Sequence, residues 1–272
     1  MISYIELARP QNCLMAGIAI AIGGLIGAES TFIEHILPIA LASIIGCMIT
    51  AGGNAINDFY DAKIDAINRP DRPIPSGKIS PNNALLFSLG LFFIGTTLSF
   101  FINPICLFIA LLSSIALIYY SHTLKRTILW GNLCIGYLVG STFLFGGAAV
   151  GGLVATSVPF VLAMLATVGR EIIKDIEDIK GDRGEGTITL PIAIGEKRSA
   201  AIASMFILLT ILLSPLPAML NLFGVPYLLV VCLADLSFLA SIVTIKKPSR
   251  SSSFLKIGMI VALFAFIIEV MI

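Results

Sequence analysis

The chain has 272 residues, of which 57% are hydrophobic and only 12% are charged, with a formal net charge of +1. Soluble domains carry about 25% charged residues, so this composition excludes an ordinary soluble protein and indicates a membrane protein. A net charge this close to zero gives no reason to expect a nucleic-acid partner. The five cysteines lie in apolar stretches without paired spacing, so we expect neither disulfides nor cysteine-bound metal.

Long apolar stretches follow one another along the whole chain, and each is long enough to cross a bilayer as a helix. We therefore expect an all-α fold, a polytopic membrane helical bundle that forms a single domain over residues 1–272. The first stretch is followed at once by others, so we do not expect it to be a cleaved signal peptide. The nine predicted spans are residues 11–28, 35–56, 83–101, 103–120, 131–149, 152–173, 199–217, 222–245 and 253–272.

The positive charges are distributed unevenly between the two ends of these spans. All 17 Lys and Arg residues lie in the N-terminal segment or close to the connections after the second, fourth, sixth and eighth spans. The positive-inside rule assigns such connections to the cytoplasm. We therefore predict a multi-pass protein of the cell membrane whose N-terminus and acidic segments are cytoplasmic. Arg9, at the start of the first span, is interpreted as a basic interfacial anchor, with a substrate contact as the alternative.

An acidic segment follows the second apolar stretch and its Gly52-Gly53 pair, which either lines a cavity or permits tight helix packing. The segment contains Asn54, Asp58, Asp61 and Asp65, spaced by four, three and four residues. At roughly 100° per residue these side chains fall within about 60° on one helical face. Carboxylates so close together repel one another unless a cation lies between them, and oxygen-only ligands suit a hard cation such as Mg²⁺.

Basic side chains lie near this acidic face. Arg69 and Arg72 belong to a proline-rich loop that we expect to be ordered, and arginines beside metal-binding carboxylates suit a phosphate or diphosphate. Lys125, which follows the fourth span, either anchors the chain at the interface or contacts a phosphate from another side. Polar groups within later spans, among them Asn132 and Asp235, either bond to neighbouring helices or line a functional cavity.

The same acidic spacing returns after the sixth span, in Glu171, Asp175, Asp178 and Asp182. One such face could be a solvated helix end, but two faces of identical spacing favour a paired metal site. Four spans separate the two motifs, so both emerge on the same side. This arrangement suggests two parallel four-helix repeats with a ninth span added.

Two stretches, NDFYDAKIDAINRPDRP and the later KDIEDIKGD, resemble the UbiA superfamily of intramembrane prenyltransferases, and the resemblance covers the chain from end to end. The first matches the pattern Asn-Asp-x-x-Asp-x-x-x-Asp at Asn57, Asp58, Asp61 and Asp65. INRPDRPIPSGKIS, and REIIKDIEDIKGD followed by TLPIAIG, are most similar to archaeal lipid enzymes of this family. The resemblance implies a helical bundle around a central cavity that opens sideways to lipid.

The activity implied by the resemblance is Mg²⁺-dependent transfer of a geranylgeranyl group from its diphosphate to a lipid hydroxyl. The implied acceptor is geranylgeranylglyceryl phosphate. Prenylation of an aromatic, chlorophyll or quinone precursor is the alternative within the family, and a divalent-cation transporter or a lipid phosphotransferase is the alternative outside it. The implied metal ligands are Asn54, Asp58, Asp61 and Asp65 in the first motif and Asp175, Asp178 and Asp182 in the second, with Arg72, Lys125 and Arg69 as diphosphate contacts.

Overall fold

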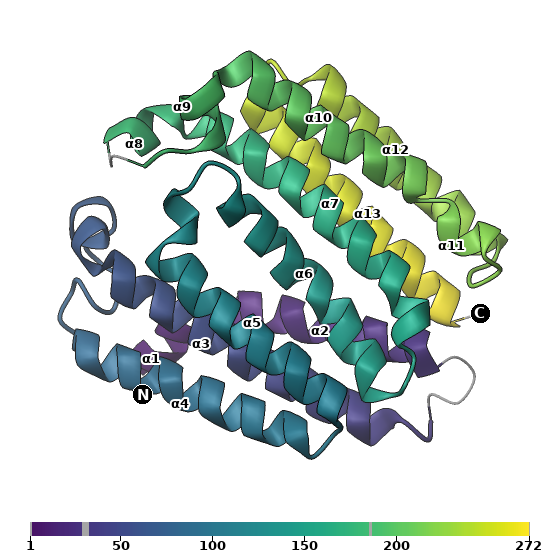
Figure 1. Ribbon diagram of the computed structural model, residues 1–272, viewed down its shortest axis with the longest axis horizontal. Coiled ribbons are helices and arrows are strands. Elements are labelled where there is room, and N and C mark those ends of the chain that lie inside the picture. The colour runs from purple at the N-terminus through teal and green to yellow at the C-terminus, as the bar shows by residue number, and fades with distance from the viewer. Residues whose placement is uncertain (1, 29–32, 185–186, 272) are drawn as a thin grey trace. The chain divides into compact units, whose positions relative to one another are not determined.

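The computed structural model describes residues 2–28, 33–184 and 187–271, and all regular elements in these ranges are helices (Figure 1). Nine helical segments within the described residues are long and apolar enough to cross a membrane, which confirms the nine predicted spans. The elements are α1 (Ile2–Ala8), α2 (Pro10–Ala28), α3 (Ile36–Asn68), α4 (Pro81–Phe100), α5 (Pro104–His122), η2 (Leu124–Arg126), α6 (Trp130–Ala149), α7 (Leu153–Glu177), α8 (Ile179–Gly184), α9 (Leu190–Ile194), α10 (Glu196–Leu213), α11 (Leu216–Met219), α12 (Val225–Val243) and α13 (Pro248–Met271).

Proline and side-chain caps begin two of the spanning helices. Ser80 precedes Pro81 and accepts a hydrogen bond from the Asn83 backbone N–H at 3.2 Å, which starts α4. Asn103 precedes Pro104 and accepts from the Cys106 N–H at 2.8 Å, which starts α5. A proline at the first helical position lacks only a donor that would have no partner within the helix, so it favours a helix start.

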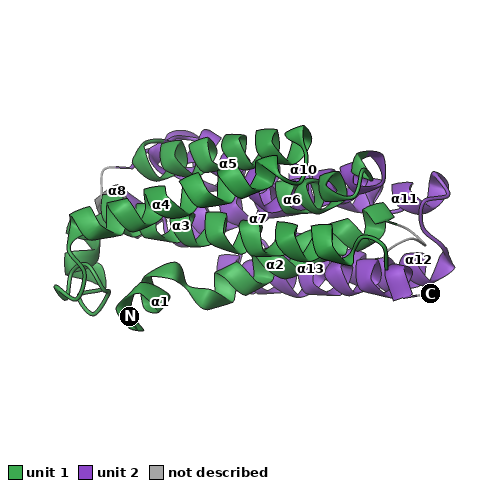
Figure 2. Cartoon of the chain, turned by 90° about the horizontal axis from the view of Figure 1, so that it is seen from below, with its two compact units in different colours: residues 1–123, 141–153 green, residues 124–140, 154–272 purple. Residues whose placement is uncertain are grey.

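The described chain divides into two compact units, which Figure 2 shows in different colours. Unit 1 comprises residues 1–123 and 141–153, and unit 2 comprises residues 124–140 and 154–272. Unit 1 therefore holds the first four spans together with the second half of α6. The first acidic motif lies on α3 in unit 1, and the second lies on α7 and α8 in unit 2.

Unit 1 is built around α3, which packs against α1, α2, α4 and α5. Its core includes the buried side chains of Ile45 and Phe92. A Cβ added to Gly52 would lie 2.9 Å from the Phe92 ring, and one added to Gly53 would lie 2.8 Å from Leu117. Both contacts are closer than real Cβ atoms make, so this glycine pair serves tight helix packing within unit 1.

Unit 2 packs α12 against α13 and α10. The carboxylate of Asp235 lies within α12, where its Oδ2 accepts a hydrogen bond from the Ser214 hydroxyl at 2.6 Å. Tyr227 donates to the Ser214 carbonyl at 2.8 Å. Ser214 therefore connects the end of α10 to α12, and its hydroxyl provides a hydrogen bond to one carboxylate oxygen of Asp235.

The α3 helix is longer than the thickness of a bilayer core. This helix has 33 residues. At about 1.5 Å per residue it measures roughly 50 Å, whereas the hydrocarbon core of a bilayer is about 30 Å thick. The helix is therefore about 20 Å longer than the hydrocarbon core, and its apolar residues 36–56 precede the turns that carry Asp58, Asp61 and Asp65.

Candidate active site

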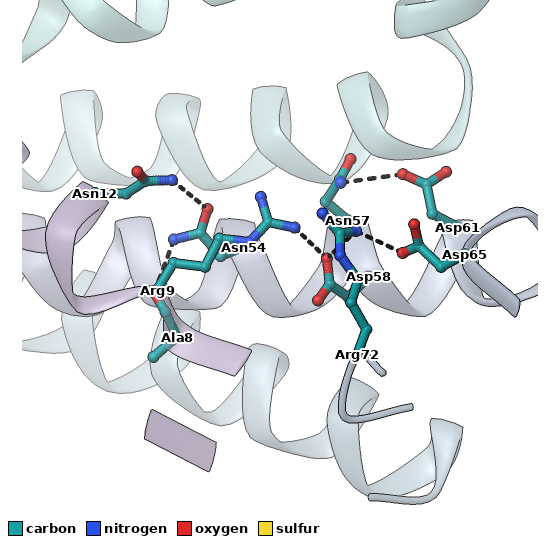
Figure 3. Close-up of polar contacts among 9 residues, drawn as sticks. All are labelled: Ala8, Arg9, Asn12, Asn54, Asn57, Asp58, Asp61, Asp65 and Arg72. Atoms are coloured by element: carbon teal, nitrogen blue, oxygen red, sulfur yellow. Dashed lines mark hydrogen bonds and ion pairs between the residues drawn. The ribbon is translucent and has the colours of Figure 1, made fainter. Parts of the chain in front are cut away.

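The first acidic motif lies on one uninterrupted stretch of α3, as its spacing predicts (Figure 3). Asp58 and Asp65 are buried, with 3% and 6% of their surfaces exposed, whereas Asp61 is half-buried. Asn57 donates its side-chain amide to Asp61 Oδ2 at 3.1 Å. Two carboxylates on the same face are therefore removed from water, and each needs a positive or hydrogen-bonding partner.

Two arginines from outside α3 supply the positive charge. Arg72 donates to Asp65 Oδ2 at 2.5 Å and to Asp58 Oδ1 at 3.2 Å, so one guanidinium bridges two members of the motif. Arg9 forms an ion pair with the same Oδ1 atom of Asp58 (Figure 3). Arg69 caps the end of α3 through its backbone N–H, which donates to the Asp65 carbonyl at 2.8 Å. Arg69 itself is exposed.

Arg72 is held in place by the ordered loop between α3 and α4. Backbone hydrogen bonds join Ser76 N–H to the Arg72 carbonyl at 3.0 Å and Ile79 N–H to the Pro73 carbonyl at 3.0 Å. Ile74 and Ile79 are buried against Ala55 of α3. Apolar burial on either side thus fixes the loop, and the Arg72 guanidinium points to the acidic face.

The N-terminal segment packs against the same region of α3. Leu7 of α1 is fully buried in the cluster that contains Ala55. Asn54 donates its amide to the Ala8 carbonyl at 2.8 Å and accepts from the Asn12 amide at 3.3 Å. Asn54, a predicted metal ligand, therefore connects the end of α1 and the start of α2 to α3.

The second motif is not on a single straight helix. The α7 helix ends at Glu177, Asp178 lies at the bend, and Asp182 is on α8. Backbone bonds of helical type continue through the bend, from Asp178 N–H to the Lys174 carbonyl at 2.9 Å and from Asp182 N–H to the Asp178 carbonyl at 3.0 Å. Hydrogen bonds of helical spacing therefore continue through the second motif, although the helix is interrupted at Asp178.

Two acids of the second motif accept hydrogen bonds from neutral side chains. Asn132 of α6 donates its amide to Asp175 Oδ2 at 2.8 Å, and the Thr189 hydroxyl donates to Asp182 Oδ2 at 3.2 Å. Asn132 is 7% exposed, so it is a buried helix-to-helix contact, which was one of its two predicted roles. Asp178 is exposed. Glu171 pairs with Arg170 at 2.9 Å.

Lys125 belongs to unit 2, on the short 3-10 helix that joins α5 to α6. The next residue, Arg126, accepts a backbone hydrogen bond from Ile188 at 3.3 Å. Thr187, one residue earlier, donates its hydroxyl to the Asp182 carbonyl at 2.9 Å. The segment 187–189 therefore connects the turn that carries Lys125 to the last acid of the second motif.

The structure brings part of the predicted site together within each unit. Asp58, Asp65 and Arg72 form one connected group, and Asp61 lies on the same face of α3. In unit 2, Asp175 and Asp182 belong to the motif that Asn132 and Thr189 hold. Sequence reasoning gave no role to Thr189, although Thr189 follows Asp182 at the same spacing of seven residues as Arg72 follows Asp65. It also missed the contact between Arg9 and Asp58, which are 49 residues apart.

The donor types fit a hard divalent cation, although among the described residues no three acids, histidines or cysteines gather closely enough to hold one. The first motif offers two buried carboxylates that already require positive charge, which Arg9 and Arg72 supply here. In the second, the carboxylates of Asp175 and Asp182 accept hydrogen bonds from the neutral donors Asn132 and Thr189. Carboxylate oxygens without sulfur or imidazole are the ligands that Mg²⁺ prefers.

Comparisons with known proteins agree along the entire chain. A profile of the UbiA prenyltransferase family matches residues 13–267. Digeranylgeranylglyceryl phosphate synthase of Methanosarcina mazei is 48% identical over 280 residues and covers 97% of each chain. The enzyme of that name from Methanopyrus kandleri is 44% identical and covers 98% of each chain.

Solved structures give the same result for the fold. A structure of digeranylgeranylglyceryl phosphate synthase superposes with a TM-score of 0.89 at 41% identity, covering 98% of this chain and 97% of that one. A UbiA homologue from Archaeoglobus fulgidus bound to GPP and Mg²⁺ superposes with a TM-score of 0.73, covering 96% of this chain and 99% of that one. At 18% identity the latter likeness shows the fold alone.

Proposed function

The chain belongs to the UbiA prenyltransferase family, and from this premise we propose that it is a digeranylgeranylglyceryl phosphate synthase. It would transfer a geranylgeranyl group from geranylgeranyl diphosphate to the free hydroxyl of geranylgeranylglyceryl phosphate. The observation that carries the proposal is the 48% identity to a synthase of this name over 97% of both chains. The two acidic motifs and their basic neighbours fit a donor substrate that carries a diphosphate.

We assign the predicted site residues to two parts of the donor. Arg72 and Lys125, with Arg69 as a further candidate, would bind diphosphate oxygens, and Arg72 is the best supported because its guanidinium already lies on the acidic face. Mg²⁺ bound at the motifs would supply positive charge opposite the leaving diphosphate. Its proposed ligands are Asn54, Asp58, Asp61 and Asp65 in unit 1 and Asp175, Asp178 and Asp182 in unit 2.

The reaction breaks the bond between the allylic carbon and the diphosphate oxygen, and it forms a bond from that carbon to the acceptor hydroxyl oxygen. The hydroxyl proton is released. Positively charged donors aimed at the departing diphosphate favour this ionisation because they stabilise the charge that develops there. The apolar helices around such a site would exclude water, which would otherwise capture the allylic carbon.

The test is an assay of purified protein with geranylgeranyl diphosphate, Mg²⁺ and separate acceptors, with products identified by mass spectrometry. We expect digeranylgeranylglyceryl phosphate from geranylgeranylglyceryl phosphate and no product from 4-hydroxybenzoate or another aromatic acceptor. Prenylation of the aromatic acceptor alone would contradict the proposal and favour the quinone branch of the family. Diphosphate release that needs no lipid acceptor would also contradict it.

A further inference from the structure

Arg9 occupies an unusual position for a simple interfacial anchor. It lies between α1 and α2 in a left-handed backbone conformation, with φ of 52°, which is uncommon for a side chain of this size. Its guanidinium forms an ion pair with Asp58, and Arg72 donates to the same carboxylate oxygen. The side chain of Asp58 is 4% exposed and that of Arg9 is 31% exposed, so this ion pair is only partly open to solvent.

The surrounding contacts fix this position independently of the ion pair. Leu7 is fully buried two residues before Arg9, and the Ala8 carbonyl accepts a hydrogen bond from Asn54. Asn12, three residues after Arg9, donates to the same Asn54 side chain. Because the backbone is held on both sides, the strained conformation at Arg9 serves to direct its guanidinium to α3.

The second motif uses the same arrangement with neutral residues. Asp58 and Asp175 hold the second position of their motifs. Asp58 accepts from Arg9, just before the preceding span, and Asp175 accepts from Asn132, within the preceding span. The last acids of the motifs, Asp65 and Asp182, each accept from the residue seven positions later, which is Arg72 or Thr189. At these four acids the first motif therefore has arginine donors, whereas the second has an amide and a hydroxyl donor.

We propose that Arg9 is a positioning residue that holds Asp58 within the first motif and competes with the divalent cation for this carboxylate. The inference rests on the proposed function, because it takes the motif as a cation site. A diphosphate anion that receives the guanidinium would release Asp58, so cation uptake at the first motif would be coupled to donor binding. Asp175 has a neutral hydrogen-bond donor, Asn132, where Asp58 has the cationic Arg9.

The expected size of the effect follows from the charge. An opposite charge within a few ångströms changes the proton affinity of a carboxylate by about ten- to a thousandfold, and a metal cation responds in the same sense. Because Arg9 is partly exposed and Arg72 remains in place, the lower end of this range applies. Loss of the Arg9 charge should therefore tighten cation binding at Asp58 about tenfold.

The experiment measures Mn²⁺ binding to the purified full-length protein by electron paramagnetic resonance, without any prenyl diphosphate. The test variant is Arg9→Asn, because asparagine adopts left-handed backbone more readily and carries no charge. We expect its Mn²⁺ affinity to rise about tenfold, and the rise should disappear when Asp58→Asn is added. The matched control is Lys78→Gln, which removes a positive charge whose partner is Glu6, at 3.6 Å, and should leave the affinity unchanged.

The outcomes separate this inference from the proposed function. Mn²⁺ binding by the wild type with no tightening in Arg9→Asn overturns the role of Arg9 alone. An absence of Mn²⁺ binding in both proteins overturns the cation sites and this inference together. If Arg9→Asn does not fold, Arg9→Lys decides the question. This variant keeps the positive charge, so its Mn²⁺ affinity should stay within about threefold of the wild-type value. A Mn²⁺ affinity lower than that would indicate a purely structural role for Arg9.

Discussion

At the scale of single residues, the paired charges on α3 determine how the first motif behaves. Asp58 and Asp65 are nearly fully buried, and Arg72 contacts both. A buried ion pair that loses one partner leaves an uncompensated charge, which typically costs about 3–5 kcal/mol. Arg72 therefore contributes to the stability of the fold as well as to the proposed contact with the diphosphate.

Arg72→Ala should lower kcat/KM for geranylgeranyl diphosphate by about ten- to a hundredfold, because a charge-assisted hydrogen bond contributes about 1.5–3 kcal/mol. Lys78→Ala is the matched control from the same loop, since Lys78 is exposed and its ion-pair partner is Glu6 rather than an acid of the motif. We expect it to change kcat/KM less than about threefold, as surface substitutions usually do. Steady-state kinetics with each substrate varied in turn provides the measurement, and equal losses in both variants would contradict the assignment.

The sequence could predict the acids and Arg72, because all of them lie within one short segment with a regular spacing. It could not predict the partner of Arg9, which is 49 residues away in the chain. The same reason applies to Asn132, which is 43 residues from Asp175. Long-range contacts between polar side chains leave no periodic signal, and only the packing of the helices brings such residues together.

At the scale of helices, hydropathy and length were sufficient to predict the spans, because a helix that crosses the hydrocarbon core needs about 20 predominantly apolar residues. The sequence did not predict the short α1 helix or the break of the second motif at Asp178. Both occur outside the continuous apolar stretches, where local propensity is weak and tertiary contacts decide the conformation. The boundaries of α3 also differ, since the helix continues to Asn68 and includes the acidic face.

Close helix packing in unit 1 gives a direct test of the element-scale account. A Cβ at Gly146 of α6 would lie 2.0 Å from the Ile20 carbonyl oxygen, whereas a Cβ at Gly90 of α4 would meet nothing within 4 Å. Gly146→Ala should destabilise the protein by about 1–3 kcal/mol, the usual effect of overpacking. Gly90→Ala should be neutral or slightly stabilising because alanine favours helix. Thermal unfolding in detergent would show this difference, and equal melting temperatures would contradict the observed packing of α6 against α2.

At the scale of the whole molecule, the family profile and the nine candidate spans establish a multi-pass membrane protein. That residues 1–272 behave as one domain remains a prediction, as does the cytoplasmic side of the acidic motifs. The distribution of Lys and Arg carries the latter prediction, because positively charged connections are retained in the cytoplasm. Composition thus predicts the membrane class, and the succession of apolar stretches predicts the number of spans.

The orientation can be tested with two single cysteine substitutions in exposed connections. Ser76 lies in the loop after α3, and Leu220 lies in the connection between α11 and α12. A membrane-impermeant maleimide added to intact cells should label Leu220→Cys and spare Ser76→Cys. Inverted membrane vesicles should give the opposite labelling. Labelling of Ser76→Cys in intact cells would place the acidic face outside the cytoplasm and contradict the positive-inside argument.

The central claim is that two cation-binding acidic motifs together support prenyl transfer to a lipid hydroxyl. The most direct measurement is the amount of digeranylgeranylglyceryl phosphate formed by wild type, Asp58→Asn and Asp182→Asn, with Mg²⁺ and with excess EDTA. We expect wild-type product only with Mg²⁺, and a loss of about a hundredfold or more in each variant while its melting temperature shows a folded protein. Full turnover in EDTA, or a loss confined to one motif, would contradict the claim.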